Sequence, residues 1–167
     1  MKAVRMLGNE QVSVVDIPDP QAEGNQVSVK IMSSALCGSE RHVYYGSNEL
    51  PGNAGHEAAG TVHDAGTSKL VSKGDRVALH ASAACGRCRE CWAGNWVRCQ
   101  NPGRTGRTIG NHSQFVQIRD DLCLPLPDDI SFDTGALLGD VMGTPFRAIK
   151  RLRIKGFDRV LIMGQGP

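Results

Sequence analysis

Four cysteines lie close together in the middle of the sequence and could hold one metal ion. Cys85, Cys88, Cys91 and Cys99 follow the spacing C-x2-C-x2-C-x7-C. Four thiolates complete the tetrahedral shell of Zn²⁺ and leave no open position, so such a site would be structural. A bound metal would also supply folding energy to a stretch of Gly, Asn, Arg and Glu that cannot form an apolar core.

A disulfide pair or a redox CxxC motif is the alternative reading of these cysteines. Zinc is favoured because the N-terminus, MKAVRMLGNE, lacks the apolar core of a signal peptide. Without secretion, thiols stay reduced, and four ligands satisfy one metal completely. We therefore predict a structural zinc lobe at about residues 85–99.

A second, weaker set of candidate ligands precedes the cysteine cluster. Cys37 and His56 are both flanked by glycine, in Cys37-Gly-Ser and Gly-His56-Glu. A thiolate and an imidazole are suitable ligands for a second zinc. Taken singly, the cysteine could be merely buried and the histidine merely a hydrogen-bonded polar residue. Together, beside a separate four-cysteine cluster, they indicate a second metal site.

The elements that must position these residues are short strands separated by turns. Polar and apolar residues alternate over several segments, as in half-buried strands, and frequent Gly and Pro supply the turns. This pattern predicts a mainly β domain, a barrel or a sandwich. The expected strands are 11–15, 26–31, 60–63, 76–79 and 114–118.

The pattern changes after Pro127. One helix is expected to open at Ser131 as N-cap and run to Ala136, and a second is expected over 144–152, with Pro145 tolerated in its first turn. An apolar strand over 159–163 then leads into a Gly-x-Gly turn, which is typical of the start of a dinucleotide-binding βαβ unit. A Gly-x-Gly fragment alone is a weak signal, and its place after an apolar strand strengthens it.

Composition excludes several classes of function. The chain has 167 residues and a net charge of +2, so it lacks the basic footprint of a nucleic-acid-binding protein. Its apolar runs are too short to span a membrane. Six cysteines without a signal peptide predict a reducing, cytoplasmic location.

Several motifs, in their order along the chain, resemble those of the zinc-dependent medium-chain alcohol dehydrogenase family. They are Cys37-Gly-Ser39-x-x-His42, Gly55-His56-Glu57-x-x-Gly60, Lys73-Gly74-Asp75-Arg76-Val77, the four-cysteine lobe and Gly164-x-Gly166-Pro167. The resemblance implies a GroES-like catalytic domain over 1–135, a partly open barrel with a few short helices. It further implies that 136–167 form connecting helices and the first strand of a truncated, NAD(P)-binding Rossmann domain.

The resemblance also implies roles for individual residues. Cys37 and His56 would be catalytic zinc ligands, with Asp140 as the third and Glu57 as a carboxylate beside the metal. Ser39 and His42 would relay the proton of the alcohol to solvent, and Gly164 and Gly166 would bind the cofactor. Simpler readings remain open: Asp140 and His42 as surface residues, Glu57 as a support of the local fold, and Ser39 as a helix N-cap.

Some residues depart from the family pattern or lack a role. Glu40 stands where the family usually has an aspartate that supports the ligand histidine, and Asn111-His112 replaces a commoner glycine pair. We interpret His63, His80 and His112 as surface or strand residues, and Cys123 as a buried apolar position.

The function implied is hydride transfer between an alcohol, with polyols and secondary alcohols among the candidates, and NAD or NADP. Because the sequence ends within the nucleotide-binding motif, we expect this chain alone to be inactive and the full-length protein to be a homo-oligomer. A non-enzymatic zinc module that binds a protein partner is the alternative.

Overall fold

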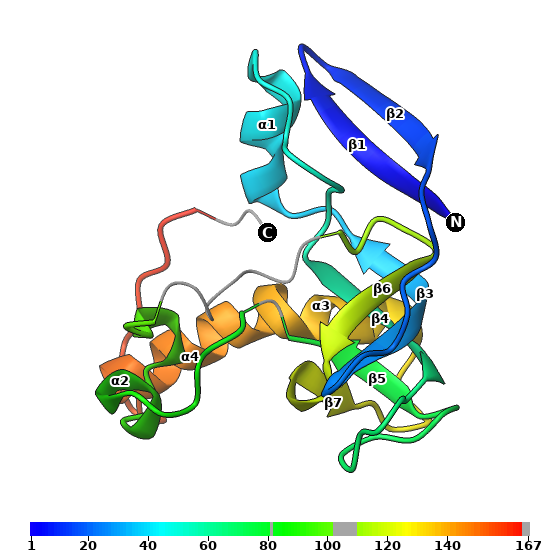
Figure 1. The fold of residues 1–167 in the computed structure, drawn as a ribbon. Helices are drawn as coiled ribbons and strands as arrows, with labels where there is room; N and C mark the ends of the chain where they lie inside the picture. Colours follow the sequence, from blue (N-terminus) through cyan, green and yellow to red (C-terminus); the bar gives the residue numbers. More distant parts are fainter. Residues whose placement is uncertain (81, 102–109, 165–167) are drawn as a thin grey trace.

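A computed structural model describes residues 1–80, 82–101 and 110–164 (Figure 1). The strands are β1 (Lys2–Gly8), β2 (Gln11–Asp16), β3 (Gln26–Ala35), β4 (Glu57–Asp64), β5 (Arg76–Leu79), β6 (Phe115–Arg119) and β7 (Cys123–Pro125). The helices are η1 (Gly38–Glu40), α1 (Arg41–Tyr45), α2 (Arg89–Trp92), η2 (Trp96–Arg98), η4 (Asp120–Leu122), α3 (Phe132–Leu137), η5 (Leu138–Met142) and α4 (Gly143–Leu152). Within the described residues, no helix is long and apolar enough to cross a membrane.

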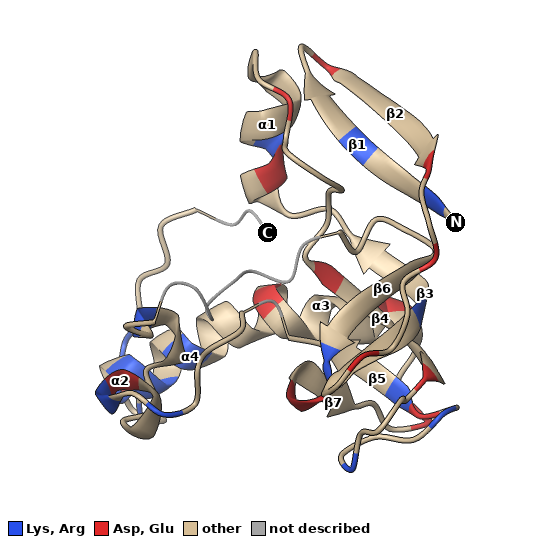
Figure 2. Cartoon of the chain, viewed as in Figure 1, with Lys and Arg blue, Asp and Glu red and all other residues tan. Residues whose placement is uncertain are grey.

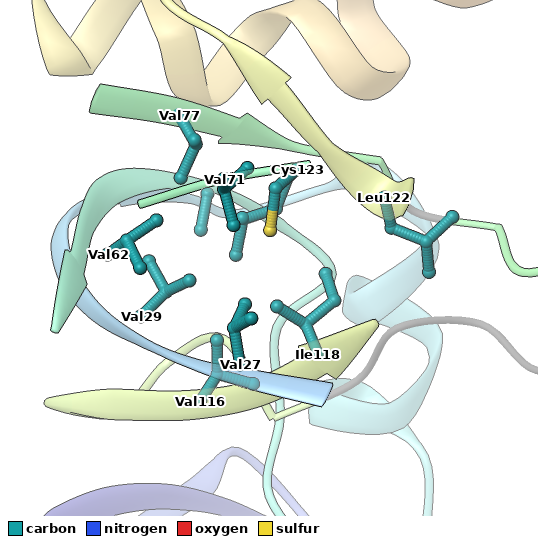
Figure 3. Packing of buried hydrophobic residues seen from close by; sticks show 11 residues of the cluster. Val27, Val29, Val62, Val71, Val77, Val116, Ile118, Leu122 and Cys123 are labelled. Carbon is teal, nitrogen blue, oxygen red and sulfur yellow. The ribbon is translucent and has the colours of Figure 1, made fainter. Parts of the chain in front are cut away.

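The larger of two buried hydrophobic clusters in the described part of the chain packs against a five-stranded antiparallel sheet with the order β6-β3-β4-β5-β7. Val27 and Val29 of β3 are fully buried and pack with Val62, Val77 and Ile118 from the neighbouring strands (Figure 3). The alternating residues of β3 therefore form a strand because every second side chain enters this core. Cys123 is buried in the same cluster, as expected.

The hairpin of β1 and β2 lies outside this sheet and carries α1 beside it (Figure 1). Its turn places Asn9 and Glu10 at positive φ, +49° and +61°, the conformation that suits the twist of a tight hairpin. Both turn residues donate backbone hydrogen bonds to the end of α1, to the carbonyls of Gly46 and Tyr44. The hairpin thus fixes the short helix that follows Cys37.

A continuous helical segment runs from Phe132 to Leu152 through α3, η5 and α4. Ser131 caps it as expected, because its hydroxyl accepts a hydrogen bond from the backbone N–H of Thr134 at 3.1 Å. Gly135 allows close packing on the sheet, since a Cβ there would lie 2.7 Å from Leu126 and 3.0 Å from Ala59. This contact anchors α3, and α4 extends from it away from the sheet (Figure 1).

The five strands expected before Pro127 are present within a few residues of the expected bounds, and both expected helices form. The strand expected over 159–163 is wrong, because these residues have neither strand nor helix structure. A strand needs a neighbour for its hydrogen bonds, and no described residue pairs with this segment, whose Leu161 and Met163 are exposed. The proposed domain boundary at 135/136 falls within α3 and stays a prediction.

Candidate functional site

Three of the candidate ligands converge, although they are far apart in the sequence. The Oδ2 atom of Asp140 lies 3.5 Å from Cys37 Sγ and 3.5 Å from His56 Nε2. All three ligand atoms lie within 4.8 Å of one another. Ligands at about 2.0–2.3 Å from a tetrahedral zinc are separated by about 3.4–3.6 Å, so this spacing fits one metal ion. We call this group the Cys-His-Asp site.

Each ligand of the Cys-His-Asp site is held at the end or bend of an element. Cys37 follows β3 and is the N-cap of η1, and His56 immediately precedes β4. Since β3 and β4 are antiparallel neighbours that pair Ala35 with Glu57, the two ligands emerge at the same edge of the sheet. Asp140 lies in the π-helical turn η5. Such turns interrupt α-helices and redirect side chains, often at functional sites.

The carboxylate of Asp140 is oriented by Thr144, one helical turn later. The Thr144 hydroxyl donates to Oδ1 at 2.6 Å, which leaves Oδ2 facing Cys37 and His56. The hydrogen bond from Thr144 is the largest influence that lowers the pKa of Asp140, and Cys37 and His56 add to it. The aspartate is therefore ionised and preoriented, which is the form that binds a metal.

Glu57, which follows His56, is a buried carboxylate with unmet hydrogen-bonding capacity. Its exposed fraction is 1 %, and neither carboxylate oxygen has a hydrogen-bond partner. Burial, followed by the negative charge of Asp140, raises the pKa of Glu57. A buried acid without partners is costly, so this residue is a candidate for taking up a proton or a cation.

Ser39 and His42 are not brought into the Cys-His-Asp site. Both are exposed, on η1 and α1, and among the described residues no hydrogen bond or ion pair joins them to the three ligands. The reading of Ser39 as an N-cap is wrong, because η1 begins earlier and Cys37 is its cap. His42 instead borders a separate surface hollow with Arg41 and Tyr45.

Two residues taken for departures from the family pattern contact each other behind the ligands. Glu40 is buried, and His112 Nε2 lies 3.4 Å from its Oε2 atom. The interpretation of His112 as a surface or strand residue without a role is wrong, since its side chain is only 12 % exposed. The contact was hidden in the sequence because the two residues come from distant segments.

The four cysteines of the lobe also meet in space. The Sγ atom of Cys88 lies 3.5 Å from Cys91 and 3.9 Å from Cys99, and Cys85 lies 3.9 Å from Cys91. These distances exceed the roughly 2.05 Å of a disulfide bond and match the edge of about 3.8 Å expected for a tetrahedral zinc–thiolate site. All four thiols are free of disulfides, which disfavours the disulfide reading.

Local structure prepares the cysteine lobe for metal. The helix α2 begins after Cys88 and places Cys91 on its first turn. The backbone N–H of Arg87 has the largest effect on Cys85, whose pKa is lowered to about 6, whereas burial raises the pKa of Cys91 to about 11. Metal binding would deprotonate the remaining thiols, as it must for a zinc–thiolate site.

A cleft of about 440 Å³ opens beside the Cys-His-Asp site. His56 and Asp140 form part of its wall, and His80, Thr144 and Arg147 form other parts. His80 was interpreted as a residue without a role, but it lines this cleft, and its ring lies edge-on to that of Trp96 in the lobe, with the ring centroids 6.1 Å apart. Figure 2 shows basic residues on both α2 and α4.

Comparison with known proteins places this arrangement in a family. The alcohol dehydrogenase GroES-like domain matches residues 23–128. The chain belongs to the zinc-type alcohol dehydrogenase family. The predicted mainly β, GroES-like fold is thereby confirmed, and the four-cysteine group is a candidate for its structural zinc.

Curated relatives match the chain over its whole length. It is 30 % identical to sorbitol dehydrogenase from Bacillus subtilis and covers 50 % of that protein. It is 34 % identical to L-threonine 3-dehydrogenase from Shewanella woodyi and covers 51 % of it. The chain therefore spans about half the length of the curated relatives it matches.

Solved structures share the fold. An NAD-dependent alcohol dehydrogenase superimposes with a TM-score of 0.81 at 26 % identity, over 95 % of this chain and 49 % of that one. Acetophenone reductase from Geotrichum candidum, solved in complex with NAD, superimposes with a TM-score of 0.82 at 28 % identity. The match covers 93 % of this chain and 48 % of that one.

Proposed function

We propose that this chain provides the zinc and substrate side of a dehydrogenase that transfers hydride between an alcohol and NAD or NADP. The observation that carries the proposal is the convergence of Cys37, His56 and Asp140 beside an open cleft. Three protein ligands leave a fourth position free, as catalytic zinc sites require. The cysteine lobe, with four ligands, has no such position.

The charges of the Cys-His-Asp site suit this chemistry. One thiolate and one carboxylate neutralise a divalent cation, and the neutral imidazole of His56 completes the set. A bound Zn²⁺ would act as a Lewis acid that lowers the pKa of an alcohol and orients it. The hydroxyl of Thr144 holds Asp140 in the orientation that suits metal binding.

Glu57 and the surface pair are assigned to proton handling. Glu57 is buried beside Asp140, and its raised pKa lets it keep a proton to a higher pH than an exposed glutamate does. Ser39 and His42 lie in the segment after Cys37, where a hydroxyl and an imidazole can pass a proton to solvent once substrate completes the path. Both are exposed to solvent here.

The cofactor would be held by the glycine motif. Gly164 has a φ of +90°, a conformation that favours glycine and lets a backbone approach a phosphate closely. Gly166 lies outside the described residues. Because one similar solved structure is an NAD-dependent alcohol dehydrogenase and another was solved in complex with NAD, we propose a nicotinamide cofactor, and polyols or secondary alcohols as the substrate class. A homo-oligomeric assembly is proposed on family resemblance alone.

A non-enzymatic zinc module is the weaker candidate. Such a module needs only the four-cysteine lobe, and it gives no reason for a second ligand set beside a cleft. It would gain support if a longer protein carrying these residues and a complete cofactor domain failed to bind nicotinamide nucleotides.

Zinc analysis of the purified chain tests the proposal. We expect two zinc ions per chain, one lost in Cys37→Ser and the other lost in Cys88→Ser. The catalytic zinc site would be overturned if Cys37→Ser kept the zinc content of the parent chain and only Cys88→Ser lost an ion. Cys123→Ser is the matched control, because Cys123 lies in the core away from both ligand groups.

A further inference from the structure

Glu40 connects the two chain segments that carry the first two ligands. Its Oε2 atom accepts the backbone N–H of Cys37 at 3.0 Å, and its Oε1 atom accepts the backbone N–H of Gly55 at 2.8 Å. Cys37 is itself a ligand, and Gly55 precedes the ligand His56. One buried carboxylate, 6 % exposed, therefore spans the gap between both ligand segments.

His112 holds this carboxylate from the far side. Its Nε2 atom lies 3.4 Å from Glu40 Oε2, and its Nδ1 atom lies 2.9 Å from the hydroxyl of Ser34. Its backbone is fixed as well, since its N–H donates to the carbonyl of Ala54 at 2.9 Å and its carbonyl accepts from Val4 at 2.8 Å. The ring is thus hydrogen-bonded at Nδ1, whereas Nε2 lies at ion-pair distance from Glu40 and makes no hydrogen bond of its own within the described residues.

Gly55 makes room for this arrangement. Its φ is +96°, and a Cβ there would lie 2.4 Å from the His112 backbone nitrogen and 2.8 Å from its ring. The segment before His56 is therefore pressed directly against His112. Any displacement of the His112 ring would be transmitted to Gly55 both by contact and through Glu40.

We propose that Glu40 and His112 act together as positioning residues that set the separation of Cys37 and His56 before a metal binds. The inference rests on the proposed zinc site at Cys37, His56 and Asp140. Groups behind the ligands commonly control metal affinity in this way. Here the carboxylate grips the backbone of both ligand segments rather than a ligand side chain.

The length of the Glu40 side chain lets one carboxylate bridge the two ligand segments. A glutamate reaches both backbone N–H groups, whereas an aspartate, shorter by one methylene, would lose at least one of them. Burial tends to raise the pKa of Glu40, but His112 and the backbone N–H of Cys37 outweigh it and lower that pKa overall. The two departures from the family pattern thus form one matched pair.

Zinc affinity tests the proposal in the full chain. We expect Glu40→Gln to weaken zinc binding at the Cys-His-Asp site by about 10- to 100-fold, while the cysteine lobe keeps its metal. Glu40→Asp should also weaken zinc binding at the Cys-His-Asp site. His112→Leu should weaken binding alone but add little in the Glu40→Gln background, because coupled residues are not additive.

A spectroscopic reading separates positioning from general destabilisation. Co²⁺ replacing Zn²⁺ at the Cys-His-Asp site should show a changed visible spectrum in Glu40→Asp, since its ligands would be rearranged. His63→Gln is the matched control, because this exposed histidine contacts Phe115 and neither ligand set. Urea unfolding of each variant identifies any that fails to fold, and Glu40→Asp and His112→Leu then carry the test.

The possible failures are distinguishable. If Cys37→Ser does not lower the zinc content, the site itself is absent and the proposed function fails. If Cys37→Ser loses one zinc but folded Glu40 and His112 variants bind zinc within twofold of the parent with an unchanged Co²⁺ spectrum, the positioning role alone is refuted.

Discussion

The hydroxyl of Thr144 offers a sharp test of how Asp140 is prepared for metal. Thr144→Val removes the donor that lies 2.6 Å from Asp140 Oδ1 while keeping the shape of the side chain. A hydrogen bond to a charged group contributes roughly 1.5–3 kcal/mol. Thr144 is exposed, so we take a value near the lower limit, about 1.4 kcal/mol, which equals a tenfold change in affinity.

We therefore expect Thr144→Val to weaken zinc at the Cys-His-Asp site by about tenfold, measured by competition with a chromophoric chelator. Thr144→Ser should retain most of the affinity, because it keeps the donor. Thr67→Val is the control, since it removes a comparable hydroxyl bond, 2.8 Å to the Gly24 carbonyl, at the opposite end of β3 and β4 from the ligands. Unchanged affinity in Thr144→Val, with zinc lost in Asp140→Asn, would refute the reasoning.

Three further predictions concern stability and metal removal. Because folding raises the pKa of Glu57 above its ordinary value of 4.5, the metal-free chain should lose stability as the pH rises through the pKa of the folded state. Urea unfolding midpoints measured across this pH range should fall less in Glu57→Gln than in the parent chain. Val29→Ala should lower the free energy of unfolding by about 1.5–3 kcal/mol, since Val29 is fully buried. In the same denaturant titration, Val14→Ala should lower it by less than about 0.5 kcal/mol, because Val14 is exposed. A chelator should change the tryptophan fluorescence, because both tryptophans of the chain, Trp92 and Trp96, lie in the cysteine lobe; an unchanged spectrum after complete zinc removal would argue against a metal-dependent lobe.

The sequence predicts what depends on local pattern. Alternating residues at Gln26–Ile31 form a strand because their period matches a half-buried sheet, and Ser131 caps a helix through a bond three residues away. Cysteine spacing likewise indicates the lobe, since its ligands are close in the chain. The strand expected at 159–163 fails because a strand depends on a partner that the local pattern cannot supply.

The Cys-His-Asp site was only partly predictable. Cys37 and His56 carry recognisable motifs, whereas Asp140 was placed by family resemblance. Nothing in the local sequence marks the π-helical turn that holds Asp140, or the contact between Glu40 and His112. Both depend on packing between segments that are distant in the chain. Thr144, which orients Asp140, could have been found from its i+4 spacing once the helix was expected.

The two ligand sets differ in how much of the chain each must close. Cys85 and Cys99 are separated by 14 positions, whereas Cys37 and Asp140 are separated by 103. Loop-closure entropy rises by about 0.6 kcal/mol for each doubling of length, so the longer loop costs about 1.8 kcal/mol more to close in an unfolded chain. The lobe can therefore capture zinc while most of the chain is still unfolded.

The Cys-His-Asp site has no such early route. Its ligands come together only after β3 and β4 have paired and the helical segment through η5 has docked on them. Zinc supplied during synthesis would enter the lobe first and the second site last. The separation of the ligands along the chain thus determines the order in which the two sites take up metal.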